Sequence, residues 1–90
     1  MPRVFFKTKA IFVIVKDSIN KNFICQFGIK LREIRESRNM TIQSLADTIN
    51  VEYSQISRIE RGLINTSIGL IYEIAVALEI DIKELFDFET

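Results

Sequence analysis

Histidine and tryptophan are absent from this chain of 90 residues, and there is a single cysteine, Cys25. An internal disulfide is therefore impossible, and a zinc site of the usual cysteine and histidine type cannot be assembled. The commonest general base, which is also the usual activator of a catalytic serine or cysteine, is missing. We therefore expect a protein that is not an enzyme and that holds no metal and no cofactor.

Long apolar runs and glycine-rich loops are also lacking. The longest uninterrupted apolar run is the six residues from Ala10 to Val15, whereas a membrane span needs about 20 residues and the core of a signal peptide about 7 to 15. The three glycines lie singly along the chain and form no phosphate-binding loop. We expect a cytoplasmic protein with no membrane association.

An excess of charge of one sign is lacking too, because 12 lysines and arginines balance 12 aspartates and glutamates. Net charge therefore favours no class of partner. The distribution is uneven, however. Residues 1–26 carry five bases and one acid, residues 27–64 six and five, and residues 65–90 one and six. Phosphate would be repelled by the last third, which is better suited to a protein partner.

We interpret residues 1–21 as an N-terminal arm and residues 22–90 as the folded domain. The arm is dense in valine, isoleucine and phenylalanine, so Lys9 to Lys16 is predicted to form a β-strand, followed by turn-prone residues at 17–20. Such a strand would pair within a hairpin with Arg3 to Lys9, lie on the helical body, or pair with its copy in a dimer. The same apolar residues also lie close to a helical stripe, and short runs do not separate the two cases.

The rest of the chain predicts a mainly α fold of five helices. From Asn22, apolar residues recur every three or four positions, which indicates a first helix that ends near Ser37 to Asn39. Thr41 is predicted to cap a second helix. Asn50 ends that helix, because asparagine tolerates the left-handed backbone of a tight break.

Three further helices follow. The third is predicted from about Tyr53 to Arg61, with Gly62 as its C-terminal cap. Polar residues 65–67 are predicted to cap a fourth helix, whose apolar stripe follows them. A short fifth helix is predicted at residues 81–86, where an aspartate and a glutamate three residues later have the spacing of a capping box.

Two short helices joined by a brief break are typical of a helix-turn-helix. Ala46 lies where the two helices must approach closely, and Asn50 lies four residues later at the turn. Beyond the turn, buried contacts are predicted for Val51, Ile56 and Ile59. Together these residues indicate a helix-turn-helix more specifically than any one of them does.

The outward side of the third helix is polar and cationic. Helical geometry assigns to it Tyr53, Ser54, Ser57, Arg58 and Arg61. Serine can hydrogen-bond base edges, a tyrosine ring can pack on a thymine methyl group, and arginine can grip guanine through O6 and N7. The alternative interpretation is an ordinary solvated helix face.

The segment from Phe27 to Phe86 resembles the phage repressor and Cro type of helix-turn-helix protein, also called the XRE family. The resemblance is carried by residues 34–41 (IRESRNMT), Leu45-Ala46, residues 56–62 (ISRIERG) and residues 74–78 (IAVAL). It implies a compact bundle of five helices whose third helix enters the DNA major groove. The implied function is a sequence-specific transcriptional regulator that binds a palindromic operator on double-stranded DNA as a homodimer.

The resemblance also assigns individual positions. Its base-reading positions fall on Tyr53, Ser54 and Arg58, with Ser57 beside them. Phosphate contacts are expected from Thr41, Ile42, Gln43, Arg61 and Asn65. Two departures are predicted to weaken binding: Ile42 stands where glutamine is common, and Glu52 stands where serine or threonine is usual.

Arg35 and Glu60 match a family pair that joins the first helix to the end of the third. We predict a structural role for this pair, because a shielded arginine–carboxylate pair fixes geometry. The alternative interpretation is a surface pair that contributes about 0 to 1 kcal/mol.

Two questions concern partners. The dimer surface is predicted to come from Ile80, Ile82, Leu85, Phe88, Ile11 and Val13. The alternative function is a helix-turn-helix module that binds another protein, such as an antitoxin subunit. Restriction-modification control proteins and antitoxins of this size both fit by resemblance.

Overall fold

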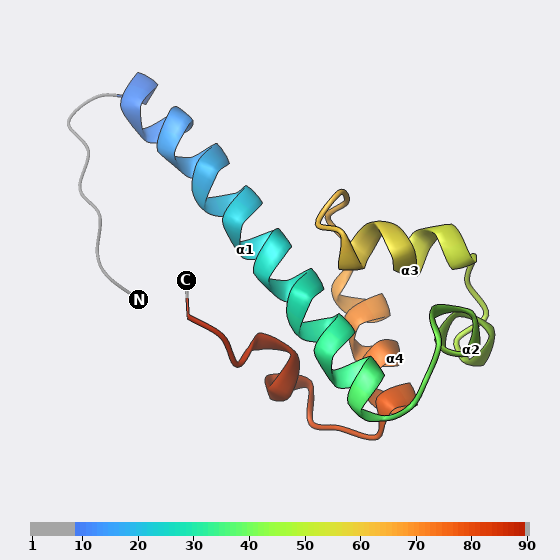
Figure 1. The fold of residues 1–90 in the computed structure, drawn as a ribbon. Coiled ribbons are helices and arrows are strands. Elements are labelled where there is room, and N and C mark those ends of the chain that lie inside the picture. Colours follow the sequence, from blue (N-terminus) through green and yellow to red (C-terminus); the bar gives the residue numbers. More distant parts are fainter. Residues whose placement is uncertain (1–8, 90) are drawn as a thin grey trace.

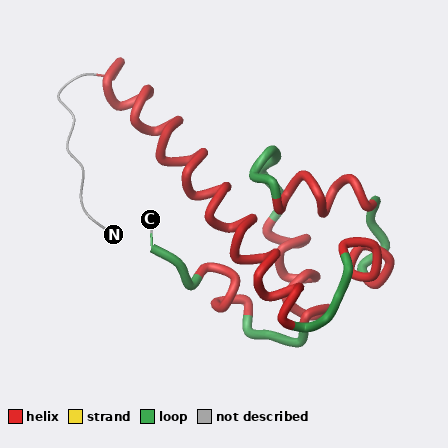
Figure 2. The backbone as a smooth tube through the Cα atoms, in the orientation of Figure 1, coloured by secondary structure: helices red, strands yellow, loops and turns green. Residues whose placement is uncertain are grey.

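The computed structural model describes residues 9–89 (Figure 1). Four α-helices and one 3-10 helix follow in chain order: α1 Lys9–Ser37, α2 Ile42–Thr48, α3 Tyr53–Glu60, α4 Ile68–Leu78 and η1 Ile82–Phe86. Figure 2 shows that no strand lies along residues 9–89. The mainly α class is confirmed. The strand predicted from Lys9 to Lys16 is wrong, and the predicted fifth helix is a 3-10 helix.

Lys9 to Lys16, predicted as a strand, form the beginning of α1. A strand needs a neighbouring strand to satisfy its peptide groups, whereas a helix satisfies them within its own segment. No proline or glycine interrupts the chain between Pro2 and Gly28, so the helix also continues through the turn-prone residues 17–20. The expected hairpin partner lies almost wholly outside the described residues.

Helix α1 sets the longest dimension of the molecule. Its 29 residues extend about 43 Å at 1.5 Å per residue, and the molecule measures 47 × 22 × 19 Å. The other helices pack beside its C-terminal half, and its N-terminal part projects beyond them (Figure 1). Despite this length, no helix within residues 9–89 is apolar enough to cross a membrane.

Side chains cap the starts of three elements as predicted. Thr41 caps α2 and Ser67 caps α4, each by accepting a hydrogen bond of 3.0 or 3.1 Å from the amide three residues on. Asp81 and Glu84 form the capping box of η1. These bonds satisfy amides that a helix leaves free at its start.

All four α-helices end at a residue in the left-handed conformation. The φ angles are 57° at Asn39, 58° at Asn50, 70° at Gly62 and 58° at Glu79. The amide that follows each of them donates to the carbonyl five residues back, over 2.9 to 3.1 Å. This arrangement satisfies carbonyls that the helix leaves free. The predicted breaks at Asn50 and Gly62 are confirmed.

One hydrophobic core joins the elements. Its completely buried large side chains come from all four α-helices and from η1: Leu31, Leu45, Ile56, Ile59, Ile74, Leu78 and Leu85. Burial of each such side chain contributes about 1.5 to 3 kcal/mol. Ala46 of α2 is also completely buried, as the helix-turn-helix prediction requires.

Helices α1 and α3 approach closely at Gly28. A Cβ atom at this position would collide with the carbonyl oxygen of Ile59 and would lie 2.6 Å from that of Glu60. Any side chain here would therefore push the end of α3 away from α1. Gly28 is required by this contact and not by its own backbone conformation.

We expect Gly28→Ala to lower the free energy of unfolding by about 1 to 3 kcal/mol, because backbone atoms must shift to admit the methyl group. Gly69→Ala is the matched control, because nothing lies within 4 Å of its Cβ position in the first turn of α4. That variant should be neutral or more stable by up to about 1 kcal/mol. Urea unfolding measures both, and equal effects would contradict the close contact.

Candidate nucleic-acid interface

Helix α3 has one buried side and one exposed side, as its sequence predicts. Ile56 and Ile59 are completely buried in the core. Tyr53, Ser54 and Arg58 are exposed on the other side, and 49% of the Tyr53 surface is accessible. These three side chains are free to contact a large ligand such as a nucleic acid.

Ser57 lies at the edge of this exposed side and is half-buried. Its carbonyl oxygen accepts a hydrogen bond of 3.3 Å from Nε of Arg61, which is exposed at the end of α3. A cation at a helix C-terminus is favoured by the partial negative charge of the last carbonyls. Because it is half-buried, Ser57 has less surface available to a ligand than Tyr53, Ser54 and Arg58.

The start of α2 lies beside the start of α3. Thr41, Ile42, Gln43 and Tyr53 line one open hollow of about 510 Å³. Ile42 packs partly against the core. The Gln43 side chain donates a 2.8 Å hydrogen bond to Oδ1 of Asp47. The structure thus brings three predicted phosphate-binding residues next to one predicted base-reading residue.

Asn65 and Arg61 lie at the other end of α3. Asn65 is exposed in the loop between α3 and α4, and it lines a different hollow together with Lys21, Cys25 and Leu63. Cys25 is exposed as well. The predicted phosphate contacts therefore fall into two groups, one at each end of α3.

Glu52 precedes α3 in the capping position, and its side chain makes no capping hydrogen bond. Serine or threonine at such a position would accept an amide hydrogen bond. The departure noted in the sequence thus leaves an exposed carboxylate beside the exposed side of α3.

A buried ion pair fixes α3 to α1. Arg35 donates hydrogen bonds from Nε to Oε2 of Glu60 at 2.6 Å and from Nη2 to Oε1 at 3.0 Å. Its Nη1 donates to the carbonyl oxygen of Met40 at 2.7 Å. Both side chains are buried, so the predicted structural pair is present and the surface alternative is wrong.

The contact with Glu60 also raises the pKa of the Arg35 guanidinium, chiefly through these hydrogen bonds. Raising the folded-state pKa of a cation adds stability that is lost only as the pH rises through that pKa. Arg35 therefore remains positively charged at any ordinary pH.

The predicted dimer residues near the C-terminus are mostly covered within the chain. Leu85 is completely buried in the core, and Ile80, Ile82 and Phe88 are half-buried against it. Leu85 therefore has no surface for a second chain to contact. Ile11 and Val13 lie in the first part of α1.

Sequence reasoning missed two features. Nothing in the sequence indicated the contact at Gly28, because the atoms that it meets belong to α3. The second feature is the exposed outer side of α4, where 61% of the Tyr72 surface is accessible, as are large parts of Ile68 and Val76. The only signal of this exposed apolar side was that α4 contains a single charged residue, Glu73, and so has almost no charged side to turn toward solvent.

Comparison with known proteins gives the same kind of protein as the resemblance noted in the sequence. Residues 31–85 match the helix-turn-helix family HTH_3. The chain belongs to this family. As an HTH_3 protein of the XRE type, it is a DNA-binding transcription regulator.

Several named proteins are similar to most of the chain. Control protein C.BamHI of Bacillus amyloliquefaciens is 40% identical over 73 residues, which are 80% of this chain and 90% of that protein. The transcriptional regulator SlrR of Bacillus subtilis is 36% identical over 64 residues, 70% of this chain but 42% of SlrR. The restriction-modification controller protein C.AhdI of Aeromonas hydrophila has a crystal structure that superposes with a TM-score of 0.69 at 35% identity, covering 70% of this chain and 96% of that one.

We expect Arg35→Gln or Glu60→Gln to lower the free energy of unfolding by about 3 to 5 kcal/mol, because each leaves a buried charge without its partner. Arg32→Gln is the control, since the Arg32–Glu36 pair is exposed and 3.6 Å long. Loss of that pair should cost about 0 to 1 kcal/mol. Urea unfolding distinguishes the cases, and losses below about 1 kcal/mol for both buried positions would contradict this account.

Proposed function

We propose that this HTH_3 regulator binds a palindromic operator on double-stranded DNA as a homodimer, with α3 of each copy in the major groove. The observation that carries the proposal is the polar, exposed side of an α3 that the buried Arg35–Glu60 pair holds against α1. Two copies bound to successive turns of one DNA face would have α3 helices about 34 to 36 Å apart. A dimer doubles the phosphate contacts, which suits a chain with no net charge.

In this proposal the residues of α3 and α2 have separate roles. Tyr53, Ser54 and Arg58 read base edges, with Ser57 beside them. The amides and side chains of Thr41, Ile42 and Gln43 bind phosphate at one end, and Arg61 and Asn65 bind it at the other. The two phosphate groups fix the position of α3 along the groove.

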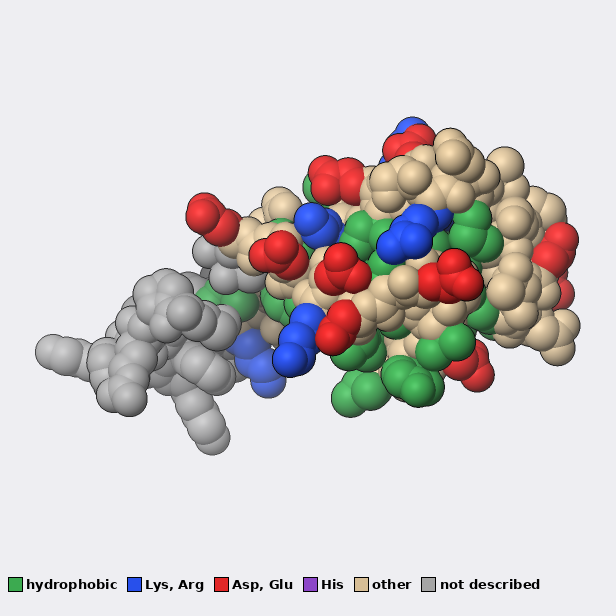
Figure 3. Space-filling view, turned by 90° about the horizontal axis from the view of Figure 1, so that it is seen from below, with side chains coloured by type: hydrophobic (Ala, Val, Ile, Leu, Met, Phe, Trp, Pro, Cys, Tyr) green, Lys and Arg blue, Asp and Glu red, His purple; other side chains and the backbone are tan. Residues whose placement is uncertain are grey.

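The charge distribution also favours DNA on the α3 side of the molecule. Acidic side chains, with lysines and arginines among them, are spread over the face seen from below in Figure 3. In Figure 1, η1 and the C-terminal segment lie toward that face, whereas α3 lies at the upper right. Residues 65–90, which include η1, carry one base and six acids. Phosphate would be repelled by this part of the chain, so DNA is expected on the α3 side.

The similarity to C.BamHI and C.AhdI supports a narrower proposal, that the regulated genes belong to a restriction-modification system. The operator would then lie upstream of such genes in the genome that encodes this chain.

Selection from a random duplex library at about 150 mM salt tests the proposal, because weak nonspecific binding is largely suppressed there. We expect enrichment of a palindrome whose half-sites are about one helical turn apart. Folded protein that enriches no sequence would instead favour the protein-interaction module.

On the selected duplex, we expect Arg58→Ala to weaken binding by about 1 to 3 kcal/mol and to relax preference at one base pair in each half-site. Arg61→Ala should weaken binding to all sequences alike and reduce its salt dependence. Arg32→Ala, on the exposed surface of α1, serves as the control. Fluorescence anisotropy over single-base variants of the duplex measures these effects, and identical profiles for the Arg58 and Arg61 variants would contradict the separate roles.

A further inference from the structure

The loop that joins α3 to α4 and the middle of α1 enclose a hollow of about 400 Å³. Lys21 and Cys25 line it from α1, and Leu63 and Asn65 line it from the loop. Figure 1 shows this loop at the C-terminal end of α3, between α3 and α1. The hollow therefore adjoins the end of α3 at which Arg61 and Asn65 are proposed to bind phosphate.

Lys21 lies on the side of α1 that contacts α3 and the loop after it. Lys21, Cys25 and Gly28 are spaced four and three residues apart, so they share one side of the helix. Gly28 meets the end of α3, and a Cβ atom at Gly62 would lie 2.7 Å from Sγ of Cys25. Lys21 is the next position along this side, one turn beyond these contacts, and it is exposed. Within residues 9–89 no ion pair engages its ammonium group, which is therefore free to bind an anion.

The loop supplies further hydrogen-bond donors to the same hollow. The amide of Leu63 donates to the carbonyl oxygen of Arg58 at 2.9 Å, but the amides of Ile64 and Asn65 donate to no carbonyl oxygen of the described residues. An amide without a partner in the chain must take one from solvent or from a ligand. Asn65 adds a side-chain amide, which is also a donor. An ammonium group and several amides together suit a phosphate, whose oxygens accept hydrogen bonds and carry negative charge.

We propose that this hollow binds a phosphate group of the DNA backbone, with the Lys21 ammonium as its counter-charge. This site builds on the proposed operator binding, in which Arg61 and Asn65 hold the backbone at the same end of α3. It extends that contact from the helix-turn-helix to α1. A phosphate contact carries no base preference, so Lys21 would add affinity and fix position while α3 reads the sequence.

Apolar residues in the lining favour the DNA backbone over a free phosphate ion. Ile24 and Ile64 line the hollow, and 62% of the Leu63 surface is exposed beside it. In DNA each phosphate is joined to sugar rings, whose carbon atoms can pack on such residues, whereas a free phosphate ion has no apolar part. The mixed lining therefore fits a segment of backbone.

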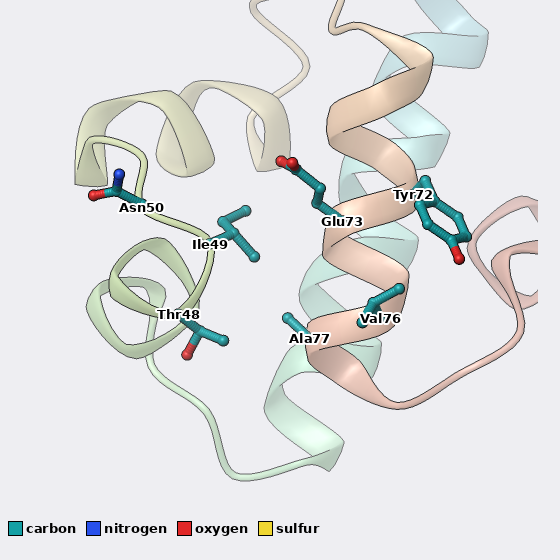
Figure 4. A pocket seen from close by; sticks show the side chains of 7 residues that line it. All are labelled: Thr48, Ile49, Asn50, Tyr72, Glu73, Val76 and Ala77. Atoms are coloured by element: carbon teal, nitrogen blue, oxygen red, sulfur yellow. The ribbon is translucent and has the colours of Figure 1, made fainter.

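The hollow between α4 and the turn from α2 to α3 provides a contrast. Its volume is similar, about 410 Å³, but none of its described lining residues is a lysine or an arginine. Figure 4 shows the Glu73 side chain extending from α4 toward the side of Ile49 and Asn50. This carboxylate would repel a phosphate. Of these two hollows, the one at Lys21 has the charge that a phosphate requires.

The salt dependence of DNA binding tests the Lys21 contact. We expect Lys21→Gln to reduce the slope of log K against log salt by about 1 for each copy bound, because one phosphate fewer is neutralised. At about 0.1 M salt this weakens binding roughly tenfold per copy. Base preference should not change, and Lys21→Arg should retain the slope. Lys83→Gln is the matched control, because it removes an exposed lysine from η1. An unchanged slope for Lys21→Gln, or an equal change for Lys83→Gln, would overturn the proposal.

Alkylation of Cys25 tests whether DNA occupies the hollow, because this side chain is the only cysteine of the chain and is exposed. A saturating duplex should slow its reaction with N-ethylmaleimide several-fold, as measured by mass spectrometry. Lys83→Cys in a Cys25→Ser background is the control and should react at the same rate with and without the duplex. A Cys25 that the duplex does not protect, or one that inorganic phosphate alone protects at the same ionic strength, would contradict a site for the DNA backbone.

The two proposals can fail separately, because both measurements can also be made on a duplex of unrelated sequence at low salt, where phosphate contacts carry the binding. A selected operator that wild type and Lys21→Gln bind alike, with Cys25 unprotected, would retain operator binding and reject this site. Binding to the unrelated duplex that depends on Lys21, with no sequence enriched, would retain this site and reject operator binding. A protein that binds neither duplex would overturn both.

Discussion

The buried contact between α1 and the end of α3 is the constraint on which the rest of the structure depends. An isolated helix of eight residues is unstable in water, so α3 owes its existence and its direction to what it packs against. Gly28 brings the two backbones together, and Arg35 then reaches Glu60 with two hydrogen bonds and Met40 with a third. This one arginine connects the end of α1, the chain that enters α2, and the end of α3. The exposed side of α3 is thereby held in one orientation.

An ion pair suits this position for a geometric reason. Removing two charges from water is costly, and a hydrophobic pair of similar volume often stabilises a protein as well or better. A planar guanidinium and a carboxylate, however, accept only a narrow range of mutual orientations. The pair therefore restricts the rotation of α3 more than a hydrophobic contact would. Rotation of α3 about its own axis would change which side chains face outward, so this restriction bears directly on recognition.

Local rules predicted most of the helical body. The caps at Thr41, Ser67 and Asp81 and the breaks at Asn50 and Gly62 follow from backbone chemistry within a few residues, and each is present. The division of α3 follows from helical periodicity, because its apolar and polar residues alternate cleanly. The Arg35–Glu60 pair came from the resemblance to the XRE family, since no local pattern joins residues 25 positions apart.

The predictions failed where local sequence preferences do not determine the structure. Residues 9–16 are rich in strand-forming types, but a strand depends on a partner and a helix does not, so α1 extends through them. The outer side of α4 could not be recognised from its pattern, because an entirely apolar helix has no polar face by which to orient it. The role of Gly28 depends on atoms of α3 that no periodicity brings near it.

The fold divides the surface into regions with different chemistry: the exposed side of α3, the acidic C-terminal segment around η1, and the apolar outer side of α4. The most direct test of their assignment is a crystal structure of the protein with its selected operator duplex. We expect α3 of each copy in the major groove, with Tyr53, Ser54 and Arg58 at base edges and α1 still joined to α3 by Arg35 and Glu60. An operator complex in which α3 lies away from the groove, or reaches only phosphates, would contradict it.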